Sequence, residues 1–291
     1  MVLENPYANS LDGLEIEDPV KSFFDYCKER ESVRKKRESG QPFPWSEDPI
    51  FQKGRFLNVF REDDKVSKSI IKFAEKAKND LPLLIQALFF GRWCNRQITL
   101  DQLNIDDLNN PDNLKKKLTN LEQWENFTAY PVEESFWNEE KYSRIDAATF
   151  KFFSIREELT EIVLNSNGDV ITATNNVNKQ FKMNNDFPIF MALIDIAWFR
   201  EDIIPMTTDV PTGIGAEPYL NRLQEFLKLD NHQDVGLKMI DLQNEYWPEA
   251  KRKFFPIDIE YQSCECRKYF SYVNGTKKFE GKNLFSFEEL N

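Results

Sequence analysis

One acidic residue stands alone in an otherwise apolar stretch. Asp195 is the only charged side chain in the thirteen residues FPIFMALIDIAWF, which span 187–199. An ionised carboxylate is costly to bury unless it is paired, hydrogen-bonded or facing a cavity. Asp195 is therefore either a carboxylate that works on a substrate or a structural group that caps a helix or pairs with an arginine. The sequence leaves both interpretations open.

Arginine and asparagine recur three residues apart at two places. NVFRED contains Asn58 and Arg61, and GRWCN contains Arg92 and Asn95. Residues at this spacing share one face of a helix. The two side chains together suit bidentate recognition of phosphates or base edges. Either pair could equally form a polar network at the edge of the core.

A glycine pair precedes a helical pattern in VPTGIGAEPYLNRL. The chain has only ten glycines, yet Gly213 and Gly215 flank a single apolar residue. Glycine permits backbone conformations and close approaches that other residues do not. The pair is either a tight turn or a hairpin whose backbone N–H groups hold a phosphate.

Other kinds of chemistry are excluded or weakly indicated. The only Gly-Lys, Gly281-Lys282, lies in a sequence that departs from the phosphate-binding P-loop pattern. His232 is the single histidine, and Cys264 and Cys266 have no second cysteine pair or neighbouring histidine to complete a zinc site. We expect no cofactor and no metal. Four cysteines, no signal peptide and no long apolar run indicate reduced thiols and a cytoplasmic protein without a membrane segment.

Basic residues gather in one part of an acidic chain. The net charge is −11, which argues against nonspecific coating of nucleic acid. Between residues 28 and 61, however, basic side chains outnumber acidic ones: Lys28, Arg30, Arg34, Lys35, Lys36, Arg37, Lys53, Arg55 and Arg61. A local basic patch suits an enzyme that holds a polyanion at one place, and a solvated helix face is the alternative.

The hydrophobic pattern is mostly helical and predicts a mainly α fold with minor β structure. Asp18-Pro19 begins the first helix, and Gly40 ends it. The best strand candidates are FTAYPV (127–132) and DVITAT (169–174). We expect an N-terminal arm over 1–17 and one helical domain over 18–291, with lobes 18–125 and 185–291. The other predicted helices span 64–78, 81–95, 111–124, 154–165, 187–200, 216–229, 235–246 and 257–272.

The region 23–64 resembles the opening signature of the helical domain attached to phage 5-hydroxymethyldeoxyuridine DNA kinases. Alpha-glutamyl/putrescinyl-thymine pyrophosphorylases share that domain. The matching residues are Arg30-Glu31, Pro44-Trp45, Asp48-Pro49, Phe56, Asn58-Val59, Arg61-Glu62 and Asp64. Later matches are Arg92 with Asn95, Asp195, Gly213 to Ala216, Glu260, Cys264-Glu265 and Lys268-Tyr269. The likeness spans most of the chain.

The resemblance implies a DNA-glycosylase-like helical architecture and action on modified pyrimidines in phage DNA, with base excision in anti-phage defence for some members. Because the sequence has no P-loop, kinase activity is not carried over, and we expect the helical domain alone. The glycine pair also resembles the hairpin of helix-hairpin-helix DNA-repair proteins, in which a catalytic Asp follows about twenty residues later, near Asp234. Thr212 interrupts that pattern, and Glu217 stands where bifunctional members carry a lysine, so the resemblance implies a monofunctional enzyme.

The leading hypothesis is a DNA glycosylase-like enzyme that cleaves the N-glycosidic bond of a hypermodified pyrimidine. A flipped base would be released while a carboxylate stabilises positive charge on the sugar. Asp195 is the first candidate for that carboxylate, followed by Glu265 and Asp234. Two alternatives remain, a transferase or pyrophosphorylase of thymine hypermodification and a non-catalytic DNA-binding module. The predicted DNA-binding residues are Arg30, Arg34, Arg55, Asn58, Arg61, Arg92, Asn95, Gly213, Gly215 and Lys268.

Overall fold

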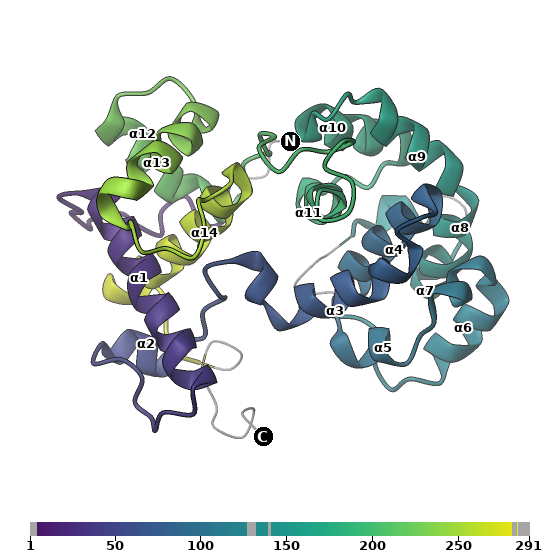
Figure 1. Ribbon diagram of the computed structural model, residues 1–291, viewed down its shortest axis with the longest axis horizontal. Coiled ribbons are helices and arrows are strands. Elements are labelled where there is room, and N and C mark those ends of the chain that lie inside the picture. The colour runs from purple at the N-terminus through teal and green to yellow at the C-terminus, as the bar shows by residue number, and fades with distance from the viewer. Residues whose placement is uncertain (1–4, 127–131, 139–140, 281–283, 285–291) are drawn as a thin grey trace. The chain divides into compact units, whose positions relative to one another are not determined.

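The computed structural model describes residues 5–126, 132–138, 141–280 and 284, and over these residues the chain is helical (Figure 1). The mainly α prediction is confirmed. The one β contact among the described residues is an isolated antiparallel bridge between Gly54 and Leu284. Within the same residues no helix is long and apolar enough to cross a membrane.

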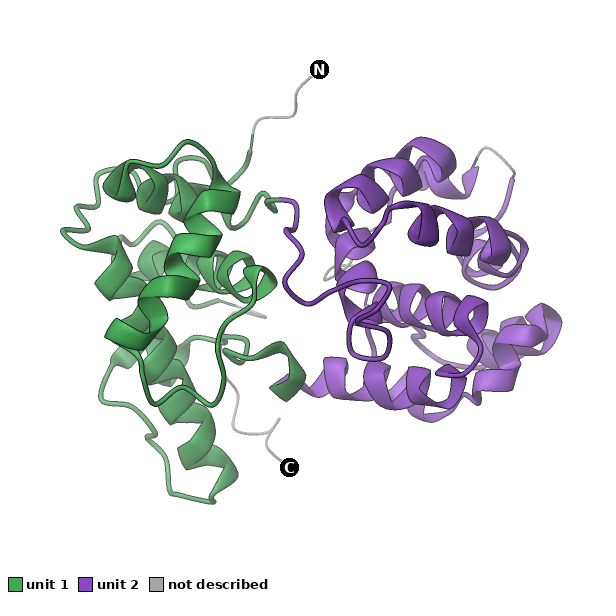
Figure 2. Ribbon diagram, turned by 45° about the horizontal axis from the view of Figure 1, so that its top comes forward, with its two compact units in different colours: residues 1–63, 212–291 green, residues 64–211 purple. Residues whose placement is uncertain are grey.

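Two compact units divide the chain (Figure 2). Unit 1 combines residues 1–63 with 212–291, and unit 2 is the continuous segment 64–211. These boundaries differ from those of the expected lobes 18–125 and 185–291. The difference arises because the N-terminal helix packs with the C-terminal helices of the chain, while residues 64–211 pack among themselves.

Unit 1 is a group of helices around an aromatic core. The first helix begins as the sequence predicts, since the side chain of Asp18 accepts the N–H of Lys21 at 2.8 Å and Pro19 occupies the first turn. Phe23 and Phe24 are fully buried in this core. The helices of the unit are α1 (Pro19–Glu38), α2 (Pro49–Lys53), α12 (Glu217–Leu227), α13 (His232–Tyr246) and α14 (Pro256–Val273), with the 3-10 turn η1 (Arg61–Asp63).

Unit 2 is built around α4 (Leu81–Cys94), which is buried from Leu83 to Cys94. A helix that is apolar on all sides needs neighbours all round it. The neighbours are α3 (Lys65–Ala74), α9 (Arg156–Asn165) and α11 (Asp186–Ile196). Short elements complete the unit: η2 (Glu75–Ala77), α5 (Gln97–Asp101), η3 (Ile105–Asn109), α6 (Pro111–Thr119), η4 (Glu134–Phe136), α7 (Arg144–Asp146), the π-helical η6 (Ala147–Lys151), α8 (Phe152–Ser154) and α10 (Val170–Phe181).

The strand predicted over 169–174 is wrong. This segment opens α10, and Asp169 caps that helix by accepting the N–H groups of Ile171 and Thr172. The other predicted strand, 127–132, lies outside the described residues except for its last position.

Candidate functional site

The segment 54–63 of unit 1 has little regular structure and is held in place by buried polar side chains. Arg30 of α1 is 5% exposed, and its guanidinium donates to the carbonyls of Leu57 at 2.9 Å and Phe56 at 3.0 Å. It also donates to Oδ1 of Asn58 at 2.6 Å. Arg30 therefore supplies the hydrogen bonds that this stretch of backbone would otherwise lack.

Helix α14 also holds this segment. Gln262 donates to the carbonyls of residues 58 and 59, both at 3.1 Å. Glu265 accepts the N–H of Leu57 at 2.9 Å and is paired with Lys268 at 3.2 Å. The segment is thus fixed between α1 and α14.

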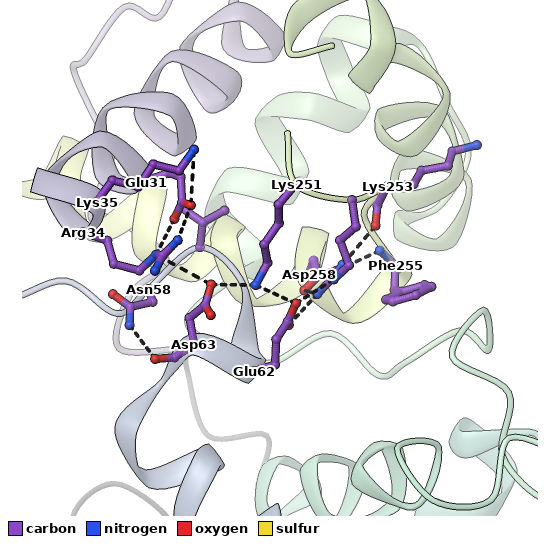
Figure 3. Close-up of polar contacts among 12 residues, drawn as sticks. Glu31, Arg34, Lys35, Asn58, Glu62, Asp63, Lys251, Lys253, Phe255 and Asp258 are labelled. Carbon is purple, nitrogen blue, oxygen red and sulfur yellow. Dashed lines mark hydrogen bonds and ion pairs between the residues drawn. The ribbon is translucent and has the colours of Figure 1, made fainter. Parts of the chain in front are cut away.

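An ion-pair network fixes the end of the segment (Figure 3). Asp63 lies 3.6 Å from Arg34 of α1 and 2.6 Å from Lys251. Glu62 contacts Lys251 at 2.9 Å and Arg252 at 2.8 Å. Burial alone would raise the pKa of Glu62, but its hydrogen bonds to Arg252 and Lys251 outweigh burial and lower the pKa to about 2.

The proline-tryptophan signature has a structural role at the start of α2. Asp48 accepts the N–H of Ile50 at 2.7 Å as the N-cap of that helix. Its second oxygen accepts the hydroxyl of Tyr269 at 2.6 Å. The indole of Trp45 donates to the carbonyl of Gln41 at 2.7 Å. These residues join the loop after α1 to α14.

Glu260 is the carboxyl group in this region that the fold leaves incompletely satisfied. It is 5% exposed, and its Oε1 accepts the N–H of Gly213 at 3.0 Å. Its Oε2 is buried and has no hydrogen-bond partner among the described residues. Burial raises the pKa of Glu260 to about 7, against the opposing effects of the Gly213 hydrogen bond and the nearby charge of Arg61. Such a group is ionised in only part of the molecules at neutral pH.

The glycine turn is shaped by contacts inside unit 1. Gly213 donates its N–H to Glu260, and the carbonyl of Gly215 accepts Nε of Arg267 at 3.0 Å. A Cβ at Gly215 would lie 2.6 Å from Sγ of Cys264, so packing on α14 requires glycine there. The close packing accounts for glycine at position 215, whereas the hydrogen bond of Gly213 uses only its backbone N–H. Contact of either glycine with a DNA phosphate stays a prediction.

The lone histidine supports the same turn. His232 lies 3.0 Å from the hydroxyl of Thr212 through Nδ1 and 2.8 Å from Oδ1 of Asn221 through Nε2. Burial lowers its pKa below the ordinary value, with a smaller opposing effect from Glu217. His232 therefore connects the turn to α12 and α13.

The predicted catalytic carboxylates lie in different places. Asp195 is fully buried in unit 2, where Arg92 binds its two oxygens at 2.6 and 3.0 Å. Glu265 of unit 1 is occupied by Lys268 and a backbone N–H. Asp234 is exposed in the first turn of α13 and bonds to Asn231. The structure therefore does not bring these three carboxylates together within one unit.

Most of the predicted DNA-binding side chains have partners inside the protein. Arg34 makes ion pairs with Glu31 and Glu38. Asn95 is the left-handed C-cap of α4, and Arg55 is exposed. Their contact with DNA stays a prediction, as it does for the remaining members of the predicted set.

Glu260 was missed as a site residue by the sequence reasoning. The available signal is the one that identified Asp195, an acid in an apolar run, here the PIDIEY that opens α14. Asp258 in the same run accepts Arg252 at 2.6 Å, which marks it as structural. No group of three His, Cys, Asp or Glu suited to a metal occurs in the described part of the chain.

Fold and site together define a helical protein in which a buried acidic group lies beside a glycine turn. Comparison with protein families identifies the chain more closely. It belongs to the family described as the helical domain of 5-hmdU DNA kinase, which it matches over residues 17–278. Comparisons with curated proteins and with solved structures gave no match. Residues 17–278 include both the signature segment and Glu260.

Proposed function

We propose that this protein is an enzyme that acts on a 5-substituted pyrimidine in DNA, with Glu260 as its acid–base group. The proposal rests on one observation, a buried glutamate with one oxygen held by Gly213 and the other without a hydrogen-bond partner in the described structure. Membership of a family described by a 5-hmdU DNA kinase supports a modified uracil in DNA as the substrate class.

The favoured reaction is cleavage of the N-glycosidic bond. The target base would leave the stack to reach the site. A carboxyl group with a pKa of about 7 can take a proton from water or give one to the departing base at neutral pH. Gly213 would fix the orientation of the carboxyl and leave Oε2 for this exchange.

The other carboxylates are weaker candidates on geometric grounds. Both oxygens of Asp195 are bound by Arg92 in an enclosed pair. Glu265 supports the backbone of Leu57, and Asp234 is exposed to solvent. Perturbed pKa values concentrate at functional sites, which favours Glu260 among these acids.

A second candidate function is transfer of a nucleophile to an activated 5-hydroxymethyluracil with loss of pyrophosphate. The same near-neutral pKa of Glu260 favours it, since such a group could remove a proton from an incoming amine. Glycosidic cleavage leaves an abasic site, whereas transfer leaves an altered nucleoside in intact DNA.

The test is an incubation with duplex oligonucleotides that carry thymine, 5-hydroxymethyluracil or its pyrophosphorylated form. Released bases and digested nucleosides are then analysed by mass spectrometry. We expect product from a modified strand and none from thymine. Glu260→Gln should reduce turnover by about a hundredfold to a thousandfold while DNA binding persists, because it removes the titrating group and keeps its shape.

Exposed Glu225→Gln, on α12 of the same unit, is the matched control and should remain active. DNA binding without product from any strand would favour the non-catalytic module, and a fully active Glu260→Gln variant would remove Glu260 from the mechanism.

A further inference from the structure

A cavity of about 430 Å³ lies beside the second half of α1 in unit 1. One wall is α1 with the residues that follow it, and the facing wall is the segment after α13. We call it the lysine pocket. Its lining residues are Lys28, Glu31, Ser32, Lys35, Lys36, Ser39, Gln41, Trp247 and Glu249.

Two lysines of the lysine pocket make few hydrogen bonds within the described structure. The side chain of Lys35 is 60% exposed and lies 3.8 Å from Glu31, too far for a good hydrogen bond. Glu31 itself is already held by two nitrogens of Arg34, at 2.5 and 2.8 Å. Lys36 donates to one carbonyl, that of Trp45 at 2.8 Å, although an ammonium has three N–H groups.

The spacing of the polar side chains along α1 suits a repeating anion. Lys28, Ser32, Lys35 and Ser39 follow one another at intervals of four, three and four residues, so they share one face of the helix. The helical rise places Lys28 and Lys35 about 10 Å apart along the axis. The phosphates of one DNA strand succeed one another about every 3.4 Å of duplex axis, so two lysines at this separation can each contact a different phosphate.

The walls favour a phosphate backbone over a base. The one aromatic residue of the lining, Trp247, is 3% exposed and packs against Phe60 and Phe254 of the core. It therefore offers little surface on which a base could stack. Lysines and hydroxyls, by contrast, are the groups that contact phosphate oxygens in protein–DNA complexes.

We propose that the lysine pocket binds the phosphate backbone of the DNA strand on which the enzyme acts. The inference rests on the proposed function for its ligand. It assigns phosphate contact to Lys28, Lys35 and Lys36 rather than to Arg30 and Arg34, whose guanidinium groups are used within the fold. Lys28 is paired with Asp25 at 2.9 Å, but the two side chains are 35% and 44% exposed, so this surface pair can exchange for a phosphate.

The test measures binding of an unmodified duplex by the full chain as a function of salt. Lys28→Ala with Lys35→Ala should weaken binding about tenfold near 0.1 M salt and reduce the slope of log affinity against log salt by about two, because each phosphate contact contributes about 0.9. Lys238→Ala, at an exposed position of α13 in the same unit, is the matched control and should change neither quantity.

A second measurement does not depend on variants. Bound DNA should protect Lys28, Lys35 and Lys36 from acylation, as read by mass spectrometry, and leave Lys238 reactive. Inorganic pyrophosphate should compete no better than chloride at the same ionic strength. Stronger competition by pyrophosphate would assign the pocket to a free phosphate compound and overturn the proposal.

The outcomes separate this proposal from the proposed function. If the double variant binds DNA like the wild type, or if the wild type does not bind DNA at low salt, the lysine pocket is not a DNA site. If the double variant loses affinity but the wild type makes no product from any modified strand, the pocket proposal stands and the enzymatic proposal fails.

Discussion

Ionisation of Glu260 opposes folding, because its pKa is raised from 4.5 to about 7 in the folded protein. Between these two pH values the folded state holds a proton that the unfolded state has lost. The stability that the folded protein gains from holding this proton is fully present below pH 4.5 and is lost as the pH rises through about 7. We expect the difference in unfolding free energy between Glu260→Gln and the wild type to shift by about 3 kcal/mol in favour of the variant between pH 4.5 and pH 8.

Urea denaturation of both proteins across that pH range measures the difference. Glu249→Gln, at an exposed position, should run parallel to the wild type. Parallel curves for Glu260→Gln as well would mean that the carboxyl titrates in its ordinary range and has no special role at neutral pH.

Neutralising Asp195 should lower stability, whereas neutralising Glu260 should raise it. The carboxylate of Asp195 is fully buried, and Arg92 binds both of its oxygens. Breaking a buried ion pair from one side typically costs about 3–5 kcal/mol. We expect Asp195→Asn to lose stability in this range, with activity lost only in proportion to the unfolded fraction. A double-mutant cycle with Arg92→Met should show coupling, and a stable but inactive Asp195→Asn would restore Asp195 as the catalytic carboxylate.

The sequence indicates which single residues need a partner or a function, but it does not indicate which residue the partner is. The isolation of Asp195 in an apolar run predicted a paired or functional acid, and the structure supplies the pair. The basic residues of α1 were treated as one patch. Arg30 is buried because the carbonyls of residues 56 and 57 lie against α1, and the sequence of the helix alone does not reveal that contact. Lys35, whose nearest acid is Glu31 of the same helix, stays exposed.

At the scale of elements, α10 is a helix although its first residues favour a strand. Val170, Ile171 and Thr172 are β-branched and favour a strand. The buried positions, however, are Val170, Ala173, Thr174, Val177 and Phe181, which follow helical spacing. Burial of this face and the Asp169 cap outweigh a propensity difference that amounts to less than about 1 kcal/mol per residue. Reading the pattern beyond residue 174 would have shown the helical period.

The glycine turn offers a test of how two elements fit together. Gly215→Ala would place a methyl group 2.6 Å from Sγ of Cys264, so the turn or α14 must shift. Overpacking of this kind typically costs about 1–3 kcal/mol. We expect the loss to be largely reversed by Cys264→Ala, because the next nearest contacts of the new methyl group are at 3.7 and 3.8 Å.

Chemical denaturation of the two single variants and the double variant measures this coupling. The Gly215→Ala variant should also lose activity, since the same turn positions the N–H of Gly213 on Glu260. Additive losses in the double variant would contradict the packing explanation for this glycine.

At the scale of the whole molecule, unit 1 is discontinuous in sequence, and unit 2 is inserted between its two parts. Unit 1 is formed by residues 1–63 and 212–291, so it closes only when the intervening segment brings its two parts together. Closing a long unstructured loop costs entropy, and a folded insert reduces that cost. The ion pairs of Glu62 and Asp63 hold the point at which the chain leaves unit 1.

This arrangement predicts that unit 2 folds by itself. Residues 64–211 are continuous, and the central helix α4 has its packing partners α3, α9 and α11 inside the same unit. A separate fragment 64–211 should therefore be helical by circular dichroism and unfold in one cooperative transition. Leu88 is fully buried in α4, so Leu88→Ala should cost about 2–5 kcal/mol in the fragment and a similar amount in the full chain. A fragment that unfolds gradually and binds a hydrophobic dye would show instead that unit 2 needs unit 1 for its native packing.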